Sequence, residues 1–305
     1  MNGKYRGVLF TVVSHDANQQ IFSLAFGIGD SENDASWIWF FRRLKENFGE
    51  IHGHVIISDH HRSINRAVNE VFPNVFHGLC IYHLLNNLKA KFKSKTNKLE
   101  EHYYQTMKLY SVEELNVLFY ILCSTVPGVK KYLEEVRLDR WMHAHSPSRR
   151  YNIMTTNILE SMNAVLVKVR ELPITTFVNE IRLLCQKCFY ECHNKVKDCT
   201  TKMSIDMEKN LEKRRDRVQV MDSFCVDMAL WTCGCRMFQF DQLPCEHALV
   251  IARRTAYEAY DFCSPYYSKE HWFESYKGVV HPLPHITQWS ILEHISAFKL
   301  NLPDV

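Results

Sequence analysis

Alternating and helical patterns of apolar residues divide the first part of the chain into strands and helices. Residues 8–14 and 20–28 are rich in β-forming residues and are separated by the turn sequence HDANQ, which predicts a β-hairpin. Residues 35–48 carry large apolar side chains at three- and four-residue spacings, which predicts a helix that packs on a sheet. A short apolar run over residues 54–58 predicts a buried strand that ends at Asp59.

The succession of elements continues after Asp59. Residues 62–72 predict a second helix, Pro73 follows it, and residues 76–80 predict another strand. The order of hairpin, helix, strand, helix and strand is typical of a mixed α/β domain. Residues 99 to about 145 have a helical pattern without strands, which predicts a helical insertion.

The remainder of the chain has weaker patterns. Residues 195–217 mix charges of both signs and predict an exposed helix or a linker. Aromatic residues are frequent after Tyr260, and we expect them to pack rather than to take part in chemistry: Trp272, Phe273, Tyr276 and Trp289.

The composition limits the class of protein without identifying it. With 305 residues, 46% of them hydrophobic, the chain can form one large domain or two smaller ones. No basic segment followed by an apolar core opens the chain, and no run of eighteen apolar residues occurs, so neither a signal peptide nor a membrane span is predicted. The default compartment is the cytosol or the nucleus. A net charge of +3 permits a nucleic-acid partner, but only where basic residues cluster.

Cysteines are concentrated in one short stretch, CGCRMFQFDQLPCEHAL, of a chain that has eleven cysteines in all. In a reducing compartment, cysteines are more often buried apolar residues or metal ligands than disulfides. Cys233 and Cys235 form a C-x-C pair, and Cys245 and His247 form a C-x-H pair. Three thiolates and one imidazole are a ligand set that tetrahedral zinc prefers, so we predict a structural Zn²⁺ site. The alternative is four unrelated residues in a cysteine-rich chain.

Local geometry favours convergence of the two pairs. Alternate residues of an extended strand point to the same face, so each pair can direct two side chains toward one ion. We expect residues 238–241 to form the connecting hairpin, with Gln239 at its surface and Pro244 stiffening the entry to the second pair. Because so short a segment has little core of its own, metal binding is expected to fold it.

The stretch WTCGCRMFQFDQLPCEHALVIA resembles a SWIM-type zinc finger, whose pattern of C-x-C, a variable gap and C-x-H it matches at all four ligand positions. Three upstream segments resemble the transposase core of plant Mutator-like elements and occur in that family's order: KYRGVLFTVVSHDANQQIFSLAFGIGDSENDASWIWFFRRLKENFG, HVIISDHHRSINRAVNEVFPNVFHGLCIYHLLNNLKAKF and TTNILESMNAV. The resemblance implies a ribonuclease-H-like fold, DNA transposition as the ancestral activity and a nuclear location.

We therefore predict an α/β, ribonuclease-H-like core with a helical insertion, followed by a small zinc-stabilised SWIM module. The expected parts are 1–98 for an N-terminally truncated core, 99–150 for the helical insertion, 151–194 for the end of the core with its catalytic helix, 195–222 for a charged helix or linker, 223–255 for the SWIM-type finger and 256–305 for an aromatic-rich tail.

The resemblance also implies phosphoryl transfer on DNA by two metal ions that three carboxylates hold. Asp59 matches the family's second acid, and Glu160 in TTNILESMN matches the third. Each has a structural interpretation as well. Asp59 could cap the helix that follows it, and Asn157 with Glu160 has the spacing of a capping box.

The family's first acid lies in a D-G-T type motif a few residues before the segment that reads NGKYRG here, and this chain begins at Met1. We therefore expect that acid and its strand to be missing, which would leave unpaired strand edges in the middle of the sheet. Asp16 is not expected to replace the acid, because it lies in the hairpin turn, at the end that faces away from Asp59. Mg²⁺ would bind only to a complete site, so we expect neither tight Mg²⁺ binding nor turnover. A decayed element, a gene model that starts too late and a host protein kept for binding all fit this pattern.

Two further groups of residues have open roles. Cys80 and His83 form a C-x-x-H motif that we expect to support the catalytic pocket rather than to hold a metal. A basic run either contacts nucleic-acid phosphates or is a solvated helix end: Lys89, Lys91, Lys93, Lys95 and Lys98.

Two classes of function follow. In the first, the chain is a non-catalytic, zinc-binding protein of transposase descent that engages DNA or protein partners through the finger and its basic surfaces. In the second, it is the C-terminal part of an active Mutator-like transposase whose N-terminus lies upstream. We expect the first, with no membrane association.

Overall fold

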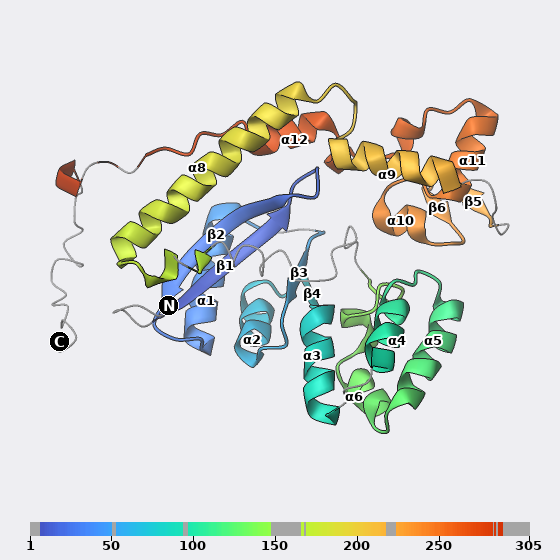
Figure 1. The fold of residues 1–305 in the computed structure, drawn as a ribbon, viewed down its shortest axis with the longest axis horizontal. Helices are drawn as coiled ribbons and strands as arrows, with labels where there is room; N and C mark the ends of the chain where they lie inside the picture. Colours follow the sequence, from blue (N-terminus) through green and yellow to red (C-terminus); the bar gives the residue numbers. More distant parts are fainter. Residues whose placement is uncertain are drawn as a thin grey trace.

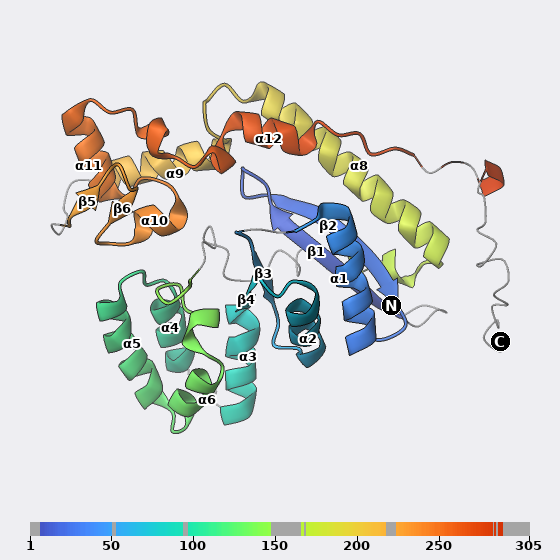
Figure 2. The same ribbon diagram turned by 180° about the vertical axis from the view of Figure 1, so that it is seen from behind.

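The N-terminal hairpin forms as the alternating pattern predicts. The computed structural model describes residues 7–50, 53–93, 97–147, 166–167, 169–217, 224–282, 284 and 286–288, shown from two opposite sides in Figures 1 and 2. Strands β1 (Val8–His15) and β2 (Ile21–Gly29) pair antiparallel, within one residue of the predicted ends. The turn between them closes on Asp16, whose Oδ1 accepts hydrogen bonds from the backbone N–H groups of Asn18 and Gln20.

The next elements also match the predictions to within one residue. Helix α1 (Asp34–Phe48) starts at Asn33, whose side chain caps the first turn. Strand β3 (Val55–Ser58) is followed by helix α2 (Arg62–Val71) and strand β4 (Phe76–Leu79), and β3 pairs parallel with β4. The crossover helix between two parallel strands confirms the mixed α/β class.

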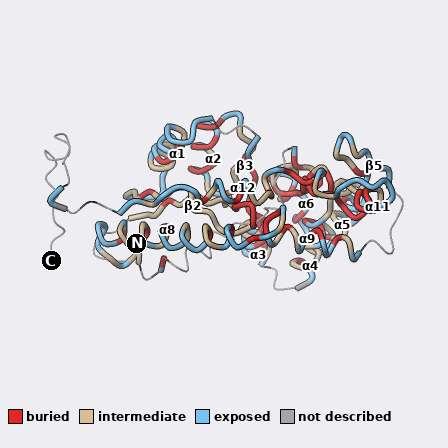
Figure 3. Tube along the Cα trace, turned by 90° about the horizontal axis from the view of Figure 1, so that it is seen from above, coloured by how far each residue is buried: buried red, intermediate tan, exposed pale blue. Residues whose placement is uncertain are grey.

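The hairpin strands lie between two layers of helices, as the view from above shows (Figure 3). On one face, Phe10 of β1 is buried in a core with Phe40 and Phe41 of α1 and with residues of α2. On the opposite face, Leu9 packs against Phe177 of helix α8 (Ile174–Asp198). Successive residues of β1 therefore serve opposite layers, as the two-residue period of a strand requires.

The described strands form three separate two-stranded sheets, β1 with β2, β3 with β4, and β5 (Val226–Asp227) with β6 (Thr232–Cys233). The ribonuclease-H-like topology remains a prediction, because that fold has one continuous sheet. Residues of both β1 and β3 line a common cavity.

The predicted helical insertion has helices and no strand in its described part. It comprises α4 (Asn97–Met107), α5 (Val112–Thr125), α6 (Val129–Glu135) and the short 3₁₀ helix η1 (Leu138–Arg140), which pack against α3 (Ile81–Phe92). Tyr103 and Trp141 are fully buried and stack with ring centroids 5.7 Å apart. This core is formed by the insertion and α3, and Leu79 of β4 also belongs to it.

The C-terminal half is built from α8, α9 (Ile205–Asp216), α10 (Met237–Asp241), α11 (Glu246–Thr255) and α12 (Lys269–Tyr276), with short 3₁₀ helices at Val169–Glu171 (η2), Ala259–Phe262, Pro265–Tyr267 and Ile286–Gln288. The predicted tail packing is confirmed for Trp272 and Tyr276, which are buried. Phe273 is more exposed, and Trp289 lies outside the described residues.

Two predictions for this half need correction. Residues 238–241 are helical, because a single helical turn buries Phe238, Phe240 and Asp241 together. The charged segment 195–217 is not simply exposed, since α9 buries Leu211 and Arg214. Over the described part of the chain, no helix has both the length and the apolar character of a membrane span.

Candidate metal centre

The first ligand pair is held by a tight turn at the end of β6. Arg236 has a left-handed backbone (φ 64°), and its N–H donates to the carbonyl of Cys233 at 2.8 Å. This fold-back brings the N–H of Cys235 to 3.5 Å from the Cys233 sulfur. Gln239 of α10 is not a plain surface residue, because its side-chain amide bonds both the N–H and the carbonyl of Cys233, each at 3.1 Å. Hydrogen bonds within the protein therefore hold this turn.

The second ligand pair lies at the start of α11. Cys245 occupies the N-cap position and His247 lies in the first turn. The Nδ1 atom of His247 is 3.6 Å from the Cys233 sulfur and 3.9 Å from the Cys245 sulfur. One ligand atom from each of Cys233, Cys235, Cys245 and His247 lies within 4.8 Å of every other. The predicted convergence of these four side chains on one point is thus present.

The arrangement fits a tetrahedral zinc ion. Zinc–sulfur bonds of about 2.3 Å place ligand atoms about 3.8 Å apart at tetrahedral angles, close to the separations found here. The thiols already interact: a hydrogen bond from Cys245 lowers the pKa of Cys235, while burial raises the pKa of Cys233. The N-terminus of α11 adds a positive dipole end that favours thiolates. Bound zinc would replace the shared thiol protons and hold β6 to α11.

Aromatic side chains frame the four ligands. Phe238 of α10 is fully buried and stacks on Trp231 with centroids 6.0 Å apart. The ring of Phe224 meets His247 edge to face at 4.8 Å. The other nitrogen of His247, Nε2, is buried without a hydrogen-bond partner. Residues 224–255, the zinc module, thus have a small core. The imidazole of His247 has little room to rotate within it.

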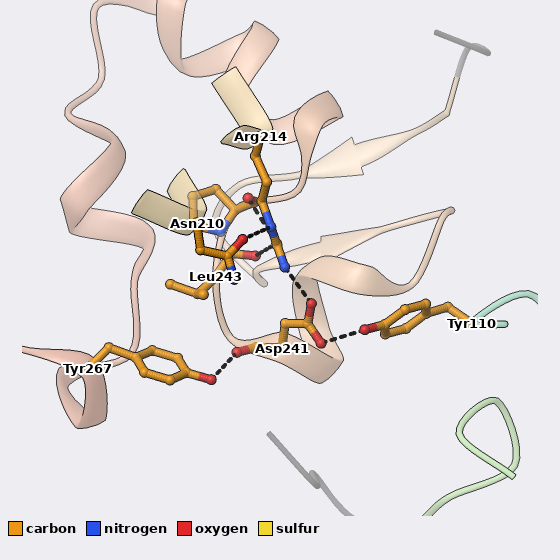
Figure 4. Close-up of polar contacts among 7 residues, drawn as sticks. Tyr110, Asn210, Arg214, Asp241, Leu243 and Tyr267 are labelled. Atoms are coloured by element: carbon orange, nitrogen blue, oxygen red, sulfur yellow. Dashed lines mark hydrogen bonds and ion pairs between the residues drawn. The ribbon is translucent and has the colours of Figure 1, made fainter. Parts of the chain in front are cut away.

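A buried ion pair joins this module to α9 and to the helical insertion (Figure 4). Arg214 donates to Asp241 Oδ2 at 2.5 Å, and both side chains are nearly inaccessible, at 7% and 5% exposure. Arg214 also donates to the carbonyls of Leu243 and Pro244. Tyr110 of the insertion donates to the second carboxylate oxygen of Asp241 at 2.8 Å. The two buried charges therefore neutralise each other, and each also forms hydrogen bonds to other groups, as burial of an ion pair requires.

Two further contacts fix the module against the insertion. Arg236 Nη1 donates to the carbonyl of Ala144 at 2.9 Å, and the ring of His143 meets Phe240 at 5.2 Å. Figures 1 and 2 both show α10 as the element of this module nearest to α4 and α5. The sequence carries no signal for these contacts, because their partners are about a hundred residues apart.

Asp59 follows β3 and is held by its neighbours. Its Oδ1 accepts the N–H of His61 at 3.0 Å, a local turn rather than an N-cap, because His61 itself is the cap residue of α2. The carbonyl of Asp59 accepts a hydrogen bond from Ser58 Oγ. One carboxylate oxygen is thereby engaged in local structure, and the side chain lines a cavity.

Behind Asp59, Ser58 Oγ lies 2.8 Å from His77 Nε2, a pair that resembles a catalytic dyad. Arg140 lies 3.1 Å from the other nitrogen, His77 Nδ1. Because arginine can only donate, Nδ1 accepts, and neutral His77 carries its proton on Nε2 and donates to Ser58. Burial, assisted by Arg140, lowers the pKa of His77 to about 3. His77 therefore cannot act as a base toward Ser58, and the chain of hydrogen bonds positions Asp59 instead.

Asp16 has no capacity left for a metal. Besides the two turn N–H groups on Oδ1, its Oδ2 accepts hydrogen bonds from Trp272 Nε1 at 2.8 Å and Tyr276 Oη at 2.9 Å. The carboxylate thus ties the hairpin to α12, a role that the sequence does not reveal. Asp16 lines the same cavity as Asp59, so the expectation that its end of the hairpin faces away from Asp59 is wrong. Four hydrogen bonds, rather than its position, keep Asp16 from binding a metal.

Of the other predicted site residues, some lie in the described part of the chain and two do not. Glu160 and Lys95 lie outside the described residues. Cys80 is buried at the start of α3, and His83 lines the same cavity as Asp59, which suits the predicted supporting role.

The basic run is partly engaged within the protein. Lys89 pairs with Glu100 at 2.6 Å, and Lys91 lies over the ring of Tyr132. Lys93 ends α3 in a left-handed conformation. A role for Lys89, Lys91, Lys93 and Lys95 in phosphate binding remains a prediction.

Comparison with known proteins identifies two segments of the chain. Residues 1–87 match the model of the MULE transposase domain, and residues 217–255 match that of the SWIM zinc finger. The resemblance inferred from the sequence is thereby confirmed, and the SWIM match encloses all four converging ligands.

Two curated proteins share part of the sequence. Protein FAR1-RELATED SEQUENCE 5 of Arabidopsis thaliana is 28% identical over 145 residues, 46% of this chain and 17% of that protein. PKS-NRPS hybrid synthetase cheA of Chaetomium globosum is 28% identical over 98 residues, 31% of this chain and 2% of that protein. The matched regions span only a small part of either relative.

Proposed function

For a chain that carries a MULE transposase domain followed by a SWIM zinc finger, we propose a zinc-dependent DNA-binding function in the nucleus, without DNA cleavage. The convergence of Cys233, Cys235, Cys245 and His247 is the observation that carries the zinc part of the proposal. In this proposal zinc is structural: it holds the module that lies beside α9 and the insertion. The chemistry that it supplies is thiolate and imidazole coordination, with no bound water required.

A cationic surface beside the zinc module supports DNA as the partner. Helices α9 and α11 contact each other, and Arg253 of α11 donates to the carbonyl of Arg215. The α9–α11 cationic surface consists of exposed side chains at the C-terminal ends of these two helices, including the C-cap residue of α9: Lys213, Arg217, Arg253 and Arg254. Glu212 and Asp216 share α9, yet no ion pair joins an acid to any of the four cations among the described residues. Their charge is available to phosphates.

The absence of cleavage is proposed from how the carboxylates are used. Asp16 is saturated by four donors, and Asp59 is engaged in a local turn. Mg²⁺ needs several oxygen ligands directed at one point, and neither residue is arranged to supply them alone. The second candidate, part of an active transposase, is favoured by the position of Asp59 in a cavity.

DNA binding can be tested by fluorescence anisotropy on a labelled duplex of about 30 base pairs, with zinc content measured in parallel. We expect one zinc per chain and binding that weakens steeply between about 50 and 200 mM salt. The double substitution Arg253→Glu with Arg254→Glu should weaken binding and reduce the salt slope by about 2, one unit for each phosphate that is no longer neutralised. Lys130→Glu with Lys131→Glu, on exposed positions of α6, is the matched control. Equal affinity for both double variants would overturn the assignment.

An activity assay on the same purified protein tests whether it cleaves DNA. Incubation with Mg²⁺ or Mn²⁺ and DNA that carries candidate element ends should give no nicking and no strand transfer. Activity that disappears with Asp59→Ala would replace the binding proposal with the transposase alternative.

A further inference from the structure

An exposed aromatic residue adjoins the α9–α11 cationic surface. Tyr257 follows the end of α11 and is 55% exposed. Ala256 before it has a left-handed backbone, and the N–H of Tyr257 donates to the carbonyl of Ala252 at 3.1 Å, an arrangement typical of a helix C-terminus. The main chain of Tyr257 is therefore fixed at the end of α11 that carries Arg253 and Arg254.

The ring of Tyr257 is held by the zinc module. It meets Phe262 with ring centroids 5.6 Å apart and ring planes at 62°. Phe262 in turn contacts Trp231 and Phe238, whose rings stack in the core of the zinc module. The contact with Phe262 orients the Tyr257 ring, while more than half of the residue stays open to solvent. A ring that is already oriented loses little conformational freedom when a ligand stacks on it.

Further cations lie along the same segment. Lys202 Nζ and the guanidinium of Arg215 lie over the ring of Tyr260, at 5.3 and 5.7 Å from its centroid. The hydroxyl of Tyr260 donates to Glu208 of α9 at 2.6 Å, so this ring is held against α9. Aromatic and cationic side chains thus alternate where α9 meets the chain that leaves α11.

The acids of this segment follow Tyr257 in the sequence. Glu258 and Asp261 are exposed and come after the ring, whereas Arg253 and Arg254 come before it. Tyr257 therefore marks the edge of the cationic surface along the chain. A nucleic-acid backbone that the arginines hold would bring its nearest bases to this edge.

An exposed ring beside phosphate-binding cations suits bases that are not paired. In an intact duplex each base stacks on its neighbours and presents only its edges in the grooves. An unpaired base has a free face, which stacks on an aromatic side chain. Tyr120 and Tyr190 are more exposed than Tyr257 but belong to α5 and α8, outside the cationic surface. Position beside the cations, rather than exposure alone, distinguishes Tyr257.

We propose that Tyr257 is a stacking platform for an unpaired base, so that the α9–α11 cationic surface binds DNA with locally unpaired strands in preference to an intact duplex. This inference rests on the proposed DNA binding and specifies the form of DNA that the site prefers. The cations neutralise the phosphates on either side of the base, and the ring of Tyr257 covers its face. Because every base has such a face, the preference is for unpaired bases rather than for a sequence.

Two labelled DNAs of equal length and equal phosphate number test this preference by fluorescence anisotropy. One is an intact duplex of about 30 base pairs, and the other has about six central thymine–thymine mismatches that form a bubble. At the same salt concentration we expect the full chain to bind the bubble about tenfold more tightly, in the range for stacking of one base on an aromatic side chain. Equal affinity for the two DNAs would overturn the inference and leave duplex binding in place.

Substitutions assign the preference to the ring. Tyr257→Ala should bring the ratio of the two affinities close to one, whereas Tyr257→Phe should keep it near ten, because stacking needs the ring and not the hydroxyl. Tyr120→Ala, at a position 76% exposed on α5, is the matched control and should keep the wild-type ratio. A preference that survives in Tyr257→Ala would show that the bubble is favoured for its flexibility, and would overturn the role of Tyr257.

The arginines separate this inference from the DNA-binding proposal on which it rests. Arg253→Glu with Arg254→Glu should weaken binding of both DNAs, because it removes phosphate contacts that the two share. A wild-type chain that binds neither DNA would overturn the DNA-binding proposal itself. Loss of the preference for the bubble, with duplex binding retained, would overturn only the stacking platform.

Discussion

Gln239 shows how a residue that binds no metal can shape a metal site. Its amide bridges the N–H and the carbonyl of Cys233, so it orients the turn that carries two of the proposed ligands. The ligands themselves are predictable, because thiols and an imidazole at these spacings are rare outside metal sites. The sequence pattern places Gln239 at the surface instead, because the hairpin that it predicts for residues 238–241 is wrong. Residues that support ligands follow the local fold and carry no motif of their own.

The affinity for zinc should distinguish residues that bind the metal from residues that only orient its ligands. We expect Cys245→Ser to lower the affinity for Zn²⁺ by more than about 100-fold, because it removes a thiolate ligand. Gln239→Ala should lower it by about tenfold, in the range for partners that orient ligands. Competition with a chromophoric chelator measures both. Leu230→Ala, at a position 72% exposed in the same module, is the control. An unchanged affinity in Cys245→Ser would contradict the four-ligand site.

His77 should make the stability of the protein depend on pH. Its folded-state pKa of about 3 lies below the ordinary value of 6.5, so the unfolded chain takes up a proton first as the pH falls. The stabilisation is complete above about pH 6.5 and is lost progressively between about pH 6.5 and 3, at about 1.4 kcal/mol per pH unit. We expect His77→Gln to remove this component, because a glutamine amide can accept from Arg140 and donate to Ser58 without titrating.

Urea unfolding at about pH 7.5, 6 and 5 tests this prediction. The free energy of unfolding should fall more steeply with acidification in the wild type than in His77→Gln, by about 2 kcal/mol at pH 5. Because all other titrating residues are shared, the difference isolates His77. Parallel curves for the two proteins would show that His77 is not buried in its neutral form.

At the scale of elements, α9 illustrates the limits of sequence patterns. The segment EKRRD contains only charged residues and predicts an exposed helix, yet Arg214 is buried in a pair with Asp241 of α10. No periodicity distinguishes Arg214 from Arg215, because the partner that neutralises it lies elsewhere in the chain. The hairpin and α1 are located within one residue, since their alternation and their apolar stripe depend only on nearby residues.

Breaking the pair between α9 and α10 should be costly. Arg214→Met leaves the carboxylate of Asp241 buried without its cation, and we expect a loss of about 3–5 kcal/mol in the free energy of unfolding. Arg42→Met removes an ion pair with Glu70 in which the arginine is 61% exposed, and should change the stability by less than about 1 kcal/mol. Denaturant unfolding compares the two. Similar losses would mean that Asp241 accepts a proton or finds water in the variant.

At the scale of the whole molecule, distant segments are joined through single carboxylates. Asp16 links the first hairpin to α12, and Asp241 links the zinc module to α9 and to the insertion through Tyr110. The links of Asp16 to α12 and of Asp241 to Tyr110 are not predictable from the sequence, because each pairs residues more than a hundred positions apart. Helix α10 lies between Cys235 and Cys245 in the sequence and carries both Phe240 and Asp241. It therefore connects the zinc module to the helical insertion.

Zinc removal should therefore loosen the insertion as well as the finger. Helix α10 lies between two of the proposed ligands in sequence, so loss of the metal releases it at both ends and with it the contacts to Tyr110, His143 and Ala144. After chelation we expect faster hydrogen exchange in residues 225–255 and also in residues 108–111 and 141–146. The hairpin over residues 8–29 should be unaffected, because its ladder and Asp16 hold it independently. Faster exchange confined to residues 225–255 would contradict this coupling, since it would mean that the insertion keeps its structure without the docked module.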